Sequence, residues 1–376
     1  MSPERLRRVA ELAEGWVRGG DTPALAVLVA RRGVIVLHEA FGRLSQAPDA
    51  PPVQLDSIFA LGSVTKPITA TAVMILVEDG LLGLNRPVSD YLPGFESGGK
   101  EAVMVHQLLT HTSGFNEPEL MHYKLKQEGR SGEPSFETYF GAGIDEFLRL
   151  QAGAPLWKPP GAEMSYSSYA YELLGEIVRR VSSVPLAEFA QRRIFEPLGM
   201  ADSYYIVPDS LSRRIVQIPA GSRWKLFNTR AFQLEPWACG GAFSTARDMA
   251  VFGQMFLNGG AYSGARILSP VTVREMTRNQ IPGISATFNG EFFPEASWGY
   301  GWNVKGDKKA LRGGSLTSPR MFNHGGAGGS VLWVDPVCEL VGVYFSRDTW
   351  ATGSVESPHW RGDYFANAVT ASVIEE

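Results

Sequence analysis

The sequence predicts an α+β fold, in which an antiparallel sheet flanked by helices carries a mostly helical second lobe. Short runs of β-branched and apolar residues occur near both ends of the 376-residue chain, at 24–40 and again at 300–346. Between them, from Pro93 to Arg230, helical periodicity alternates with loops rich in glycine and proline. One sheet built from both ends of the chain, with the middle packed against it, fits this order.

The N-terminal elements are predicted from their spacing. The first twenty residues favour an amphipathic helix, because apolar side chains recur at helical intervals: Leu6, Val9, Leu12, Ala13 and Trp16. Two strands follow, Ala24 to Ala30 and Val34 to Ala40. The short polar link Arg31-Arg32-Gly33 between them has the form of a hairpin turn. The antiparallel sheet therefore begins here.

The remaining elements follow in order. A helix is predicted over Lys66 to Asp79 and ends at Gly80. Further helices are predicted over Val105 to Leu109, Ile144 to Leu150, Tyr169 to Val181, Leu186 to Ile194, Ala246 to Leu257 and Pro270 to Arg278. Strands are predicted over Tyr300 to Val304, Val331 to Asp335 and Leu340 to Ser346, before a closing helix over His359 to Val373.

Two lobes are expected from this order of elements. Residues 1–92 and 231–376 would form the sheet lobe, and residues 93–230 the mostly helical lobe. Together they would make one folded unit. A cleft between two such lobes is the usual place for a ligand.

Composition excludes several classes of function. With 44% hydrophobic residues, 20% charged residues and a formal net charge of -4, the chain has the profile of a globular protein and lacks the basic stripe of a nucleic-acid binder. The sequence has neither the apolar stretch of a signal peptide nor a run of ~20 apolar residues that could span a membrane. We therefore expect a cytoplasmic protein with no membrane span.

The cysteines indicate no disulfide framework and no metal site. Cys239 and Cys338 are the only two, and they lie far apart in the sequence. We expect both to be buried free thiols.

A possible nucleophile lies where the helix over Lys66 to Asp79 begins. The segment is Ser63-Val64-Thr65-Lys66. Residues three apart share one face of a helix, so the Lys66 amine can reach the Ser63 hydroxyl. A serine hydroxyl needs a neighbouring base, and a lysine can serve if burial and the helix N-terminus lower its pKa. Alone this spacing is a weak signal, because serine is also a common N-cap residue.

A tyrosine and a glycine-rich segment strengthen the interpretation. Tyr166 lies at a loop-helix junction, where a nearby lysine charge would favour the phenolate and let the group take and return a proton. A packing role for this tyrosine is the alternative. In the segment from Phe322 to Ser330, the backbone N–H of Ala327 could pair with that of Ser63 as an oxyanion hole, although a simple glycine-rich turn would look the same.

These three segments, in this order, resemble the serine β-lactamase/penicillin-binding protein superfamily. The resemblance is to the branch of class C β-lactamases, family VIII carboxylesterases, related acyltransferases and D-aminopeptidases. Two further stretches are similar to hallmarks of that branch, Leu108 to Phe115 and Gly240 to Met249. The resemblance runs from Pro23 to Ser346 and implies a β-lactamase/transpeptidase-like fold.

Residue by residue, the resemblance implies that Ser63 is the acylated nucleophile, Lys66 its general base or proton relay, and Tyr166 the proton shuttle. His324 and Gly326 stand at the third motif, where many members have Lys-Thr-Gly and the esterase-like branch often has His-x-Gly. Within the stretch from Leu108 to Phe115, His111 and Ser113 are expected to brace the helical lobe. No cofactor and no metal is implied.

The chain departs from the pattern at Ser168, which stands where the family usually has the asparagine of Tyr-x-Asn. A serine hydroxyl could still donate to Lys66 or to substrate, but it lacks the paired donor and acceptor of an amide. The substitution therefore counts against strong lactamase or peptidase activity.

The predicted function is that of a serine carboxylesterase, which hydrolyses short or medium acyl esters through an acyl-enzyme on Ser63. Its partner would be a small-molecule ester. Aromatic-rich loops would line the acyl pocket: Met121, Tyr123, Phe136, Tyr139 and Phe140; Trp224, Phe227, Phe232 and Trp237; Phe288, Phe292 and Phe293. Three alternatives stay open: a β-lactamase or D-amino-acid amidase or peptidase, an acyltransferase, and a non-catalytic scaffold of the same fold.

Overall fold

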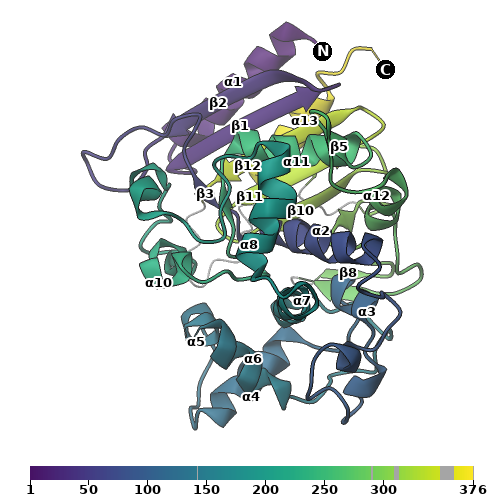
Figure 1. Cartoon of the computed structure of the whole chain (residues 1–376). Coiled ribbons are helices and arrows are strands. Elements are labelled where there is room, and N and C mark those ends of the chain that lie inside the picture. Colours follow the sequence, from purple (N-terminus) through teal and green to yellow (C-terminus); the bar gives the residue numbers. More distant parts are fainter. Residues whose placement is uncertain (142, 289–290, 309–312, 348–359, 376) are drawn as a thin grey trace.

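A six-stranded antiparallel sheet forms the centre of the protein, in the order β2-β1-β12-β11-β10-β9 (Figure 1). The computed structural model describes residues 1–141, 143–288, 291–308, 313–347 and 360–375. The strands are β1 (Ala24–Arg31), β2 (Val34–Gly42), β9 (Asn303–Val304), β10 (Phe322–Gly326), β11 (Ser330–Asp335) and β12 (Leu340–Ser346). β1 pairs with β12 from Leu25↔Ser346 to Arg31↔Leu340, so the two ends of the chain build one sheet, as predicted.

Helices cover both faces of the sheet, which explains why every residue of β1 is buried. Successive side chains of a strand point to opposite faces. Leu25, Val27 and Val29 therefore pack in one cluster with α1 (Pro3–Arg18) and α13 (Trp360–Thr370). The intervening Ala24, Ala26 and Leu28 belong to the main core on the other side, together with residues of α11 (Ala246–Leu257).

The helix α2 (Thr65–Glu78) lies at the heart of the main core, since its residues from Thr65 to Leu76 are all buried. It contacts α7 (Ser168–Ser182), and beyond α7 lie α4, α5 and α6, at the opposite end of the molecule from α1 (Figure 1). The other helices are α3 (Val105–Leu109), α4 (Glu117–Gln127), α5 (Phe136–Phe140), α6 (Ile144–Ala152), α8 (Leu186–Ala190), α9 (Glu196–Leu198), α10 (Arg230–Gln233) and α12 (Pro270–Thr277).

Short elements complete the fold. Two-stranded ribbons pair β3 (Phe59–Ala60) with β4 (Phe243–Ser244), β5 (Ala261–Tyr262) with β6 (Ala265–Arg266), and β7 (Ala286–Phe288) with β8 (Glu291–Phe293). Short 3₁₀ helices occur at Gly62–Val64, Val88–Asp90, Lys100–Ala102, Asp209–Arg214 and Lys225–Asn228. The first of them leads directly into α2.

Most predicted elements are confirmed, and several differ in their bounds. The helix predicted over Leu186 to Ile194 ends at Ala190 and continues as a π-helical turn, Gln191–Phe195. The strand predicted over Tyr300 to Val304 is only Asn303–Val304. α4 was not predicted from periodicity, because polar residues interrupt its apolar spacing. His359, where the closing helix was predicted to begin, lies outside the described residues.

Three other predictions from the sequence concern the cysteines, a membrane span and the division into lobes. Cys239 is a buried free thiol as predicted, but Cys338 is only partly buried, because it lies in the turn between β11 and β12. The described helices include none that is both long and apolar enough to cross a bilayer. The division into two lobes stays a prediction.

Candidate active site

Ser63 and Lys66 meet because a 3₁₀ turn, Gly62–Val64, runs straight into α2. Lys66 Nζ lies 3.2 Å from Ser63 Oγ, to which it donates a hydrogen bond. It also donates to the carbonyl oxygen of Cys239 at 2.8 Å. The Lys66 side chain is fully buried, whereas Ser63 remains partly exposed. This close pairing is the local geometry that the three-residue spacing predicted.

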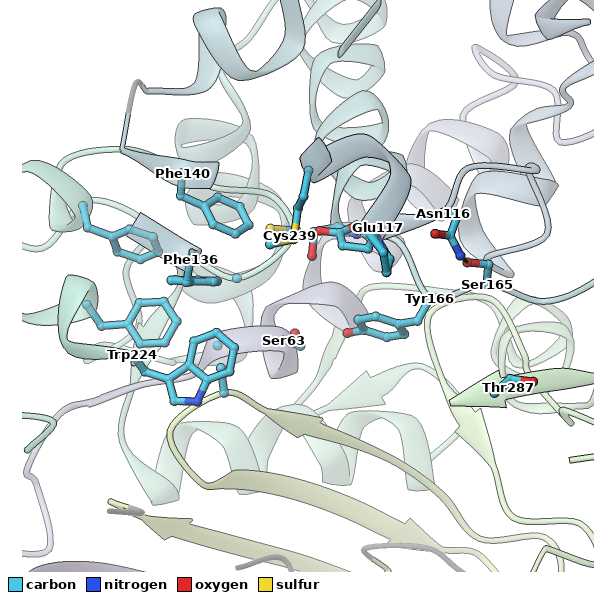
Figure 2. Close-up of a pocket in the computed structure, with 18 residues that line it drawn as sticks. Ser63, Asn116, Glu117, Phe136, Phe140, Ser165, Tyr166, Trp224, Cys239 and Thr287 are labelled. Carbon is cyan, nitrogen blue, oxygen red and sulfur yellow. Dashed lines mark hydrogen bonds between the residues drawn. The ribbon is translucent and has the colours of Figure 1, made fainter. Parts of the chain in front are cut away.

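Tyr166 completes a triad with these two residues. Lys66 Nζ lies 4.8 Å from the centroid of the Tyr166 ring, and a side-chain hydrogen bond joins the two residues. Figure 2 shows the Tyr166 hydroxyl directed toward Ser63. The three predicted catalytic residues therefore lie together, although Tyr166 is a hundred residues away from Lys66 in the sequence.

Lys66 differs from the sequence-based expectation in its charge. Burial acts to lower the pKa of Lys66, but Tyr166, Cys239 and Glu117 together outweigh it and raise that pKa above its ordinary value. An amine with a raised pKa is a poor general base. A cationic Lys66 instead stabilises negative charge on the oxygen of Tyr166 when that phenol gives up its proton. The arrangement favours Tyr166 as the residue that moves protons.

His111 holds Tyr166 in place. The two rings pack at a tilt of 33° with centroids 4.4 Å apart, and His111 Nδ1 accepts a hydrogen bond from the backbone N–H of Ser167 at 3.1 Å. Burial, followed by the charges of Lys66 and His324, lowers the pKa of His111 well below its ordinary range, so the ring is neutral. Since Nδ1 accepts, the proton of the neutral ring lies on Nε2.

The residues at the end of β10 lie close to Ser63, as the predicted oxyanion hole requires. A Cβ at Gly62 would lie 2.6 Å from Ala327 N, and one at Gly326 would lie 1.9 Å from Leu61 O and 3.2 Å from Ser63 N. Only glycine fits at these two positions. The N–H of Ser63 lies in the first turn of its helix, where N–H groups have no partner within the helix. The pairing of the Ser63 and Ala327 N–H groups stays a prediction.

A cavity of about 380 Å³ opens above Ser63. Its apolar lining includes six residues from the predicted aromatic-rich loops: Met121, Phe136, Phe140, Trp224, Phe227 and Phe232 (Figure 2). The side chain of Phe288 lies outside the described residues, while Phe292 is 64% exposed. Tyr139 and Trp237 pack behind Phe140, with ring centroids 4.9 and 5.0 Å from it.

The predicted binding residues divide into two groups. Ser63, Ser168 and Ala327 line the cavity. His324 and Gly326 are not among the described residues that line it. His324 is buried on β10, where it packs against Trp298 at 5.8 Å and Tyr166 at 6.2 Å between ring centroids. His324 therefore packs against Tyr166 without lining the cavity itself.

Ser168 faces a carboxylate that sequence analysis missed. Its N–H donates to Glu117 Oε2 at 2.8 Å, and the hydroxyls of Ser168 and Tyr139 also hydrogen-bond to the Glu117 side chain. Burial raises the pKa of Glu117, although these hydrogen bonds and the Lys66 charge oppose the shift. No motif marks Glu117; the one available signal was the helix start Asn116-Glu117-Pro118, directly after the segment from Leu108 to Phe115.

A second missed carboxylate positions the carbonyl that holds Lys66. Glu172, on α7, accepts hydrogen bonds from the N–H groups of Cys239 at 2.8 Å and Ala238 at 3.2 Å. From the other side, Thr69 on α2 donates to the carbonyl of Ala238 at 2.7 Å. The short segment that presents the Cys239 carbonyl to Lys66 is therefore clamped between α7 and α2.

Glu172 should make stability depend on pH. Burial raises its pKa from 4.5 to about 7, so the folded protein holds this proton more tightly than the unfolded chain does. Its contribution to stability is therefore fully present below the unfolded pKa and is lost as the pH rises through about 7. A shift of this size corresponds to roughly 3 kcal/mol, as an order of magnitude.

The test is urea unfolding of wild type and Glu172→Gln between about pH 5 and about pH 8. We expect the free energy of unfolding of wild type to fall relative to that of the variant over this range. Glu119→Gln, at an exposed position on α4, is the matched control and should follow wild type. Parallel curves for wild type and Glu172→Gln would show that Glu172 is ionised throughout.

Comparison with known proteins identifies the family. The model of the beta-lactamase family matches residues 9–359. The chain belongs to the beta-lactamase family. It is 29% identical over 326 residues to protein Rv1367c of Mycobacterium tuberculosis, and the match covers 78% of each chain.

Solved structures confirm that the fold is β-lactamase/transpeptidase-like. A penicillin-binding protein homologue from Caulobacter crescentus superposes with a TM-score of 0.78 at 23% identity, covering 99% of both chains. A family VIII carboxylesterase superposes with a TM-score of 0.76 at 22% identity, covering 96% of both chains. As a member of the beta-lactamase family, the protein is a hydrolase with the beta-lactamase fold. Within the described residues, no group of three or more His, Cys, Asp and Glu side chains could hold a metal ion.

Proposed function

We propose that this beta-lactamase family member is a serine carboxylesterase, which hydrolyses short or medium acyl esters through an acyl-enzyme on Ser63. The observation that carries the proposal is the triad at the base of an apolar cavity: Ser63 Oγ lies 3.2 Å from Lys66 Nζ and faces the Tyr166 hydroxyl. The aromatic lining suits a hydrocarbon acyl chain.

In the proposed first step, Ser63 Oγ attacks the ester carbonyl and its proton passes to Tyr166. Tyr166 accepts it as a phenolate, which the cationic Lys66 stabilises. The N–H groups of Ser63 and Ala327 hold the negative oxygen of the tetrahedral intermediate. Tyr166 then gives the proton to the departing alcohol, which leaves the acyl group on Ser63.

The second step repeats the same proton transfers with water. Tyr166, again a phenolate, takes a proton from a water molecule that attacks the acyl carbonyl. Collapse of the second tetrahedral intermediate breaks the bond to Ser63 Oγ, which takes back the proton from Tyr166. The carboxylic acid leaves and the free enzyme is restored.

Two features favour an ester over a β-lactam or a D-amino-acid amide. Ser168, in place of the usual asparagine, offers its N–H and hydroxyl to Glu117, so it is engaged away from an amide substrate. Glu117 also places a carboxylate in the cavity, which disfavours the carboxylate that β-lactams carry. The fold is shared with both an esterase and a penicillin-binding protein homologue, so the cavity is what separates the two functions.

The test compares p-nitrophenyl butyrate with a chromogenic cephalosporin. We expect kcat/KM for the ester to exceed that for the cephalosporin by about a hundredfold or more. Enzymes can discriminate on this scale when one substrate carries a polar group that the site disfavours, here the carboxylate of the cephalosporin. The opposite preference would make the protein a β-lactamase with an altered second motif. If free acid is lost when an alcohol acceptor is added, the protein is an acyltransferase. Failure of a fluorophosphonate to label Ser63 would instead indicate a non-catalytic scaffold.

A further inference from the structure

Glu117 introduces a formal negative charge into a cavity that is otherwise mostly apolar. The described residues that line the cavity include no lysine and no arginine. Lys66 Nζ lies just outside it, bonded to Ser63 and to the Cys239 carbonyl. Figure 2 shows Glu117 facing the same open space as Ser63, Phe136 and Trp224. An acyl chain attached to Ser63 would therefore enter a cavity that this carboxylate lines together with the rings.

Hydrogen-bond donors and a helix N-terminus surround the Glu117 carboxylate, although burial raises its pKa. Glu117 is the first residue of α4, an eleven-residue helix whose N-terminus favours negative charge. Asn116 fixes that helix start, since its side chain accepts the N–H of Glu119 at 3.2 Å. The N–H and hydroxyl of Ser168 and the hydroxyl of Tyr139 all donate to the carboxylate. Three donors and a helix terminus together oppose its protonation.

The aromatic wall beside Glu117 is packed into a fixed shape. Phe136 contacts Phe140 and Trp224 with ring centroids 4.5 Å apart in each case, and Phe227 contacts Phe232 at 4.7 Å. Aromatic rings attract cations through their faces, and aromatic cages are a common way to bind quaternary ammonium groups. A carboxylate next to such a wall therefore suits a cationic group better than a neutral one.

From this geometry we infer that Glu117 and the aromatic wall select acyl groups that carry a positive charge, a protonated amine or a quaternary ammonium, and reject acyl groups that carry a carboxylate. The inference rests on the proposed esterase function, because it concerns the acyl part of the same substrate. It assigns Glu117 as the residue that determines specificity for charge.

A matched series of p-nitrophenyl esters tests the inference. The cationic 4-(trimethylammonio)butanoate and the neutral 5,5-dimethylhexanoate have the same shape. The p-nitrophenyl monoester of adipic acid is the anionic member of the series. We expect kcat/KM to be about tenfold or more higher for the cationic ester than for the neutral one, and lowest for the anionic ester. Because burial raises the pKa of Glu117, the cationic preference should weaken as the pH falls.

Two variants locate the source of the preference. In Glu117→Gln the ratio of cationic to neutral kcat/KM should fall by about tenfold, because the amide keeps an acceptor for Ser168 N–H but has no charge. Glu119→Gln removes an exposed charge from the same helix and should keep the wild-type ratio. Equal kcat/KM for the cationic and neutral esters in wild type would overturn the inference, whether or not Glu117→Gln folds.

Binding separates this inference from the esterase proposal. The methyl esters of the same cationic and neutral acids are titrated into Ser63→Ala by calorimetry, which needs no turnover. Tighter binding of the cationic ester, by about tenfold, supports the inference even if wild type fails to hydrolyse any ester. Equal affinities overturn the inference and leave the esterase proposal to its own test.

Discussion

Replacing Ser63 by alanine is expected to abolish turnover of p-nitrophenyl butyrate, with kcat falling by on the order of 10⁴ or more. The alanine has no oxygen to form the acyl-enzyme, while Lys66, Tyr166 and the backbone N–H groups stay in place. Any residual rate would come from substrate binding and the oxyanion hole alone.

The Ser63 result is checked by steady-state kinetics, together with mass spectrometry of protein quenched during turnover. Wild type should carry a butyryl adduct on the peptide that contains Ser63, and Ser63→Ala should carry none. Ser212→Ala, at an exposed serine that is not among the residues lining the cavity, is the control for substitution itself. A wild-type rate in Ser63→Ala would show that another residue is the nucleophile.

The second large effect is expected for Tyr166→Phe, which should lower kcat by on the order of a hundredfold or more, the usual scale for a positioned acid-base group. The substitution removes only the hydroxyl that faces Ser63 and keeps the ring that packs against His111. The proposed proton transfers to and from Ser63 Oγ then have no phenol to carry them.

Tyr171→Phe is the matched control for this prediction. Its ring also lies near the amine, 5.4 Å from Lys66 Nζ, but its hydroxyl donates to the Leu109 carbonyl at 3.0 Å. We expect Tyr171→Phe to lower the free energy of unfolding by about 1 kcal/mol, the usual cost of a lost hydrogen bond, with kcat little changed. Equal losses of kcat in the two variants would demote Tyr166 to a packing residue.

Local features of the fold were readable from the sequence because chain geometry alone determines them. The hairpin of β1 and β2 follows from two apolar runs separated by Arg31-Arg32-Gly33. The contact of Lys66 with Ser63 follows from a spacing of three residues at a helix start. Motifs that resemble a known family added the assignment of Tyr166, which no local pattern could have linked to Ser63.

The charged groups of the site and their pKa values could not be predicted from local sequence. The sequence suggested that burial could lower the pKa of Lys66, whereas its neighbours Tyr166, Cys239 and Glu117 raise it. Glu117 and Glu172 carry no motif, and their positions beside Ser168 and the Cys239 backbone arise only when α4, α7 and the segment before β4 meet.

By itself, then, the sequence determined the four longest helices, the hairpin, most strands of the sheet and the contact of Lys66 with Ser63, because periodicity and short spacings act within a few residues of chain. Only the tertiary structure decided which residues share the cavity, which carboxylates lie in its walls and how Lys66 is charged. The energy of a charged group depends on burial and on every neighbour within a few ångströms, and those neighbours come from segments far apart in the chain.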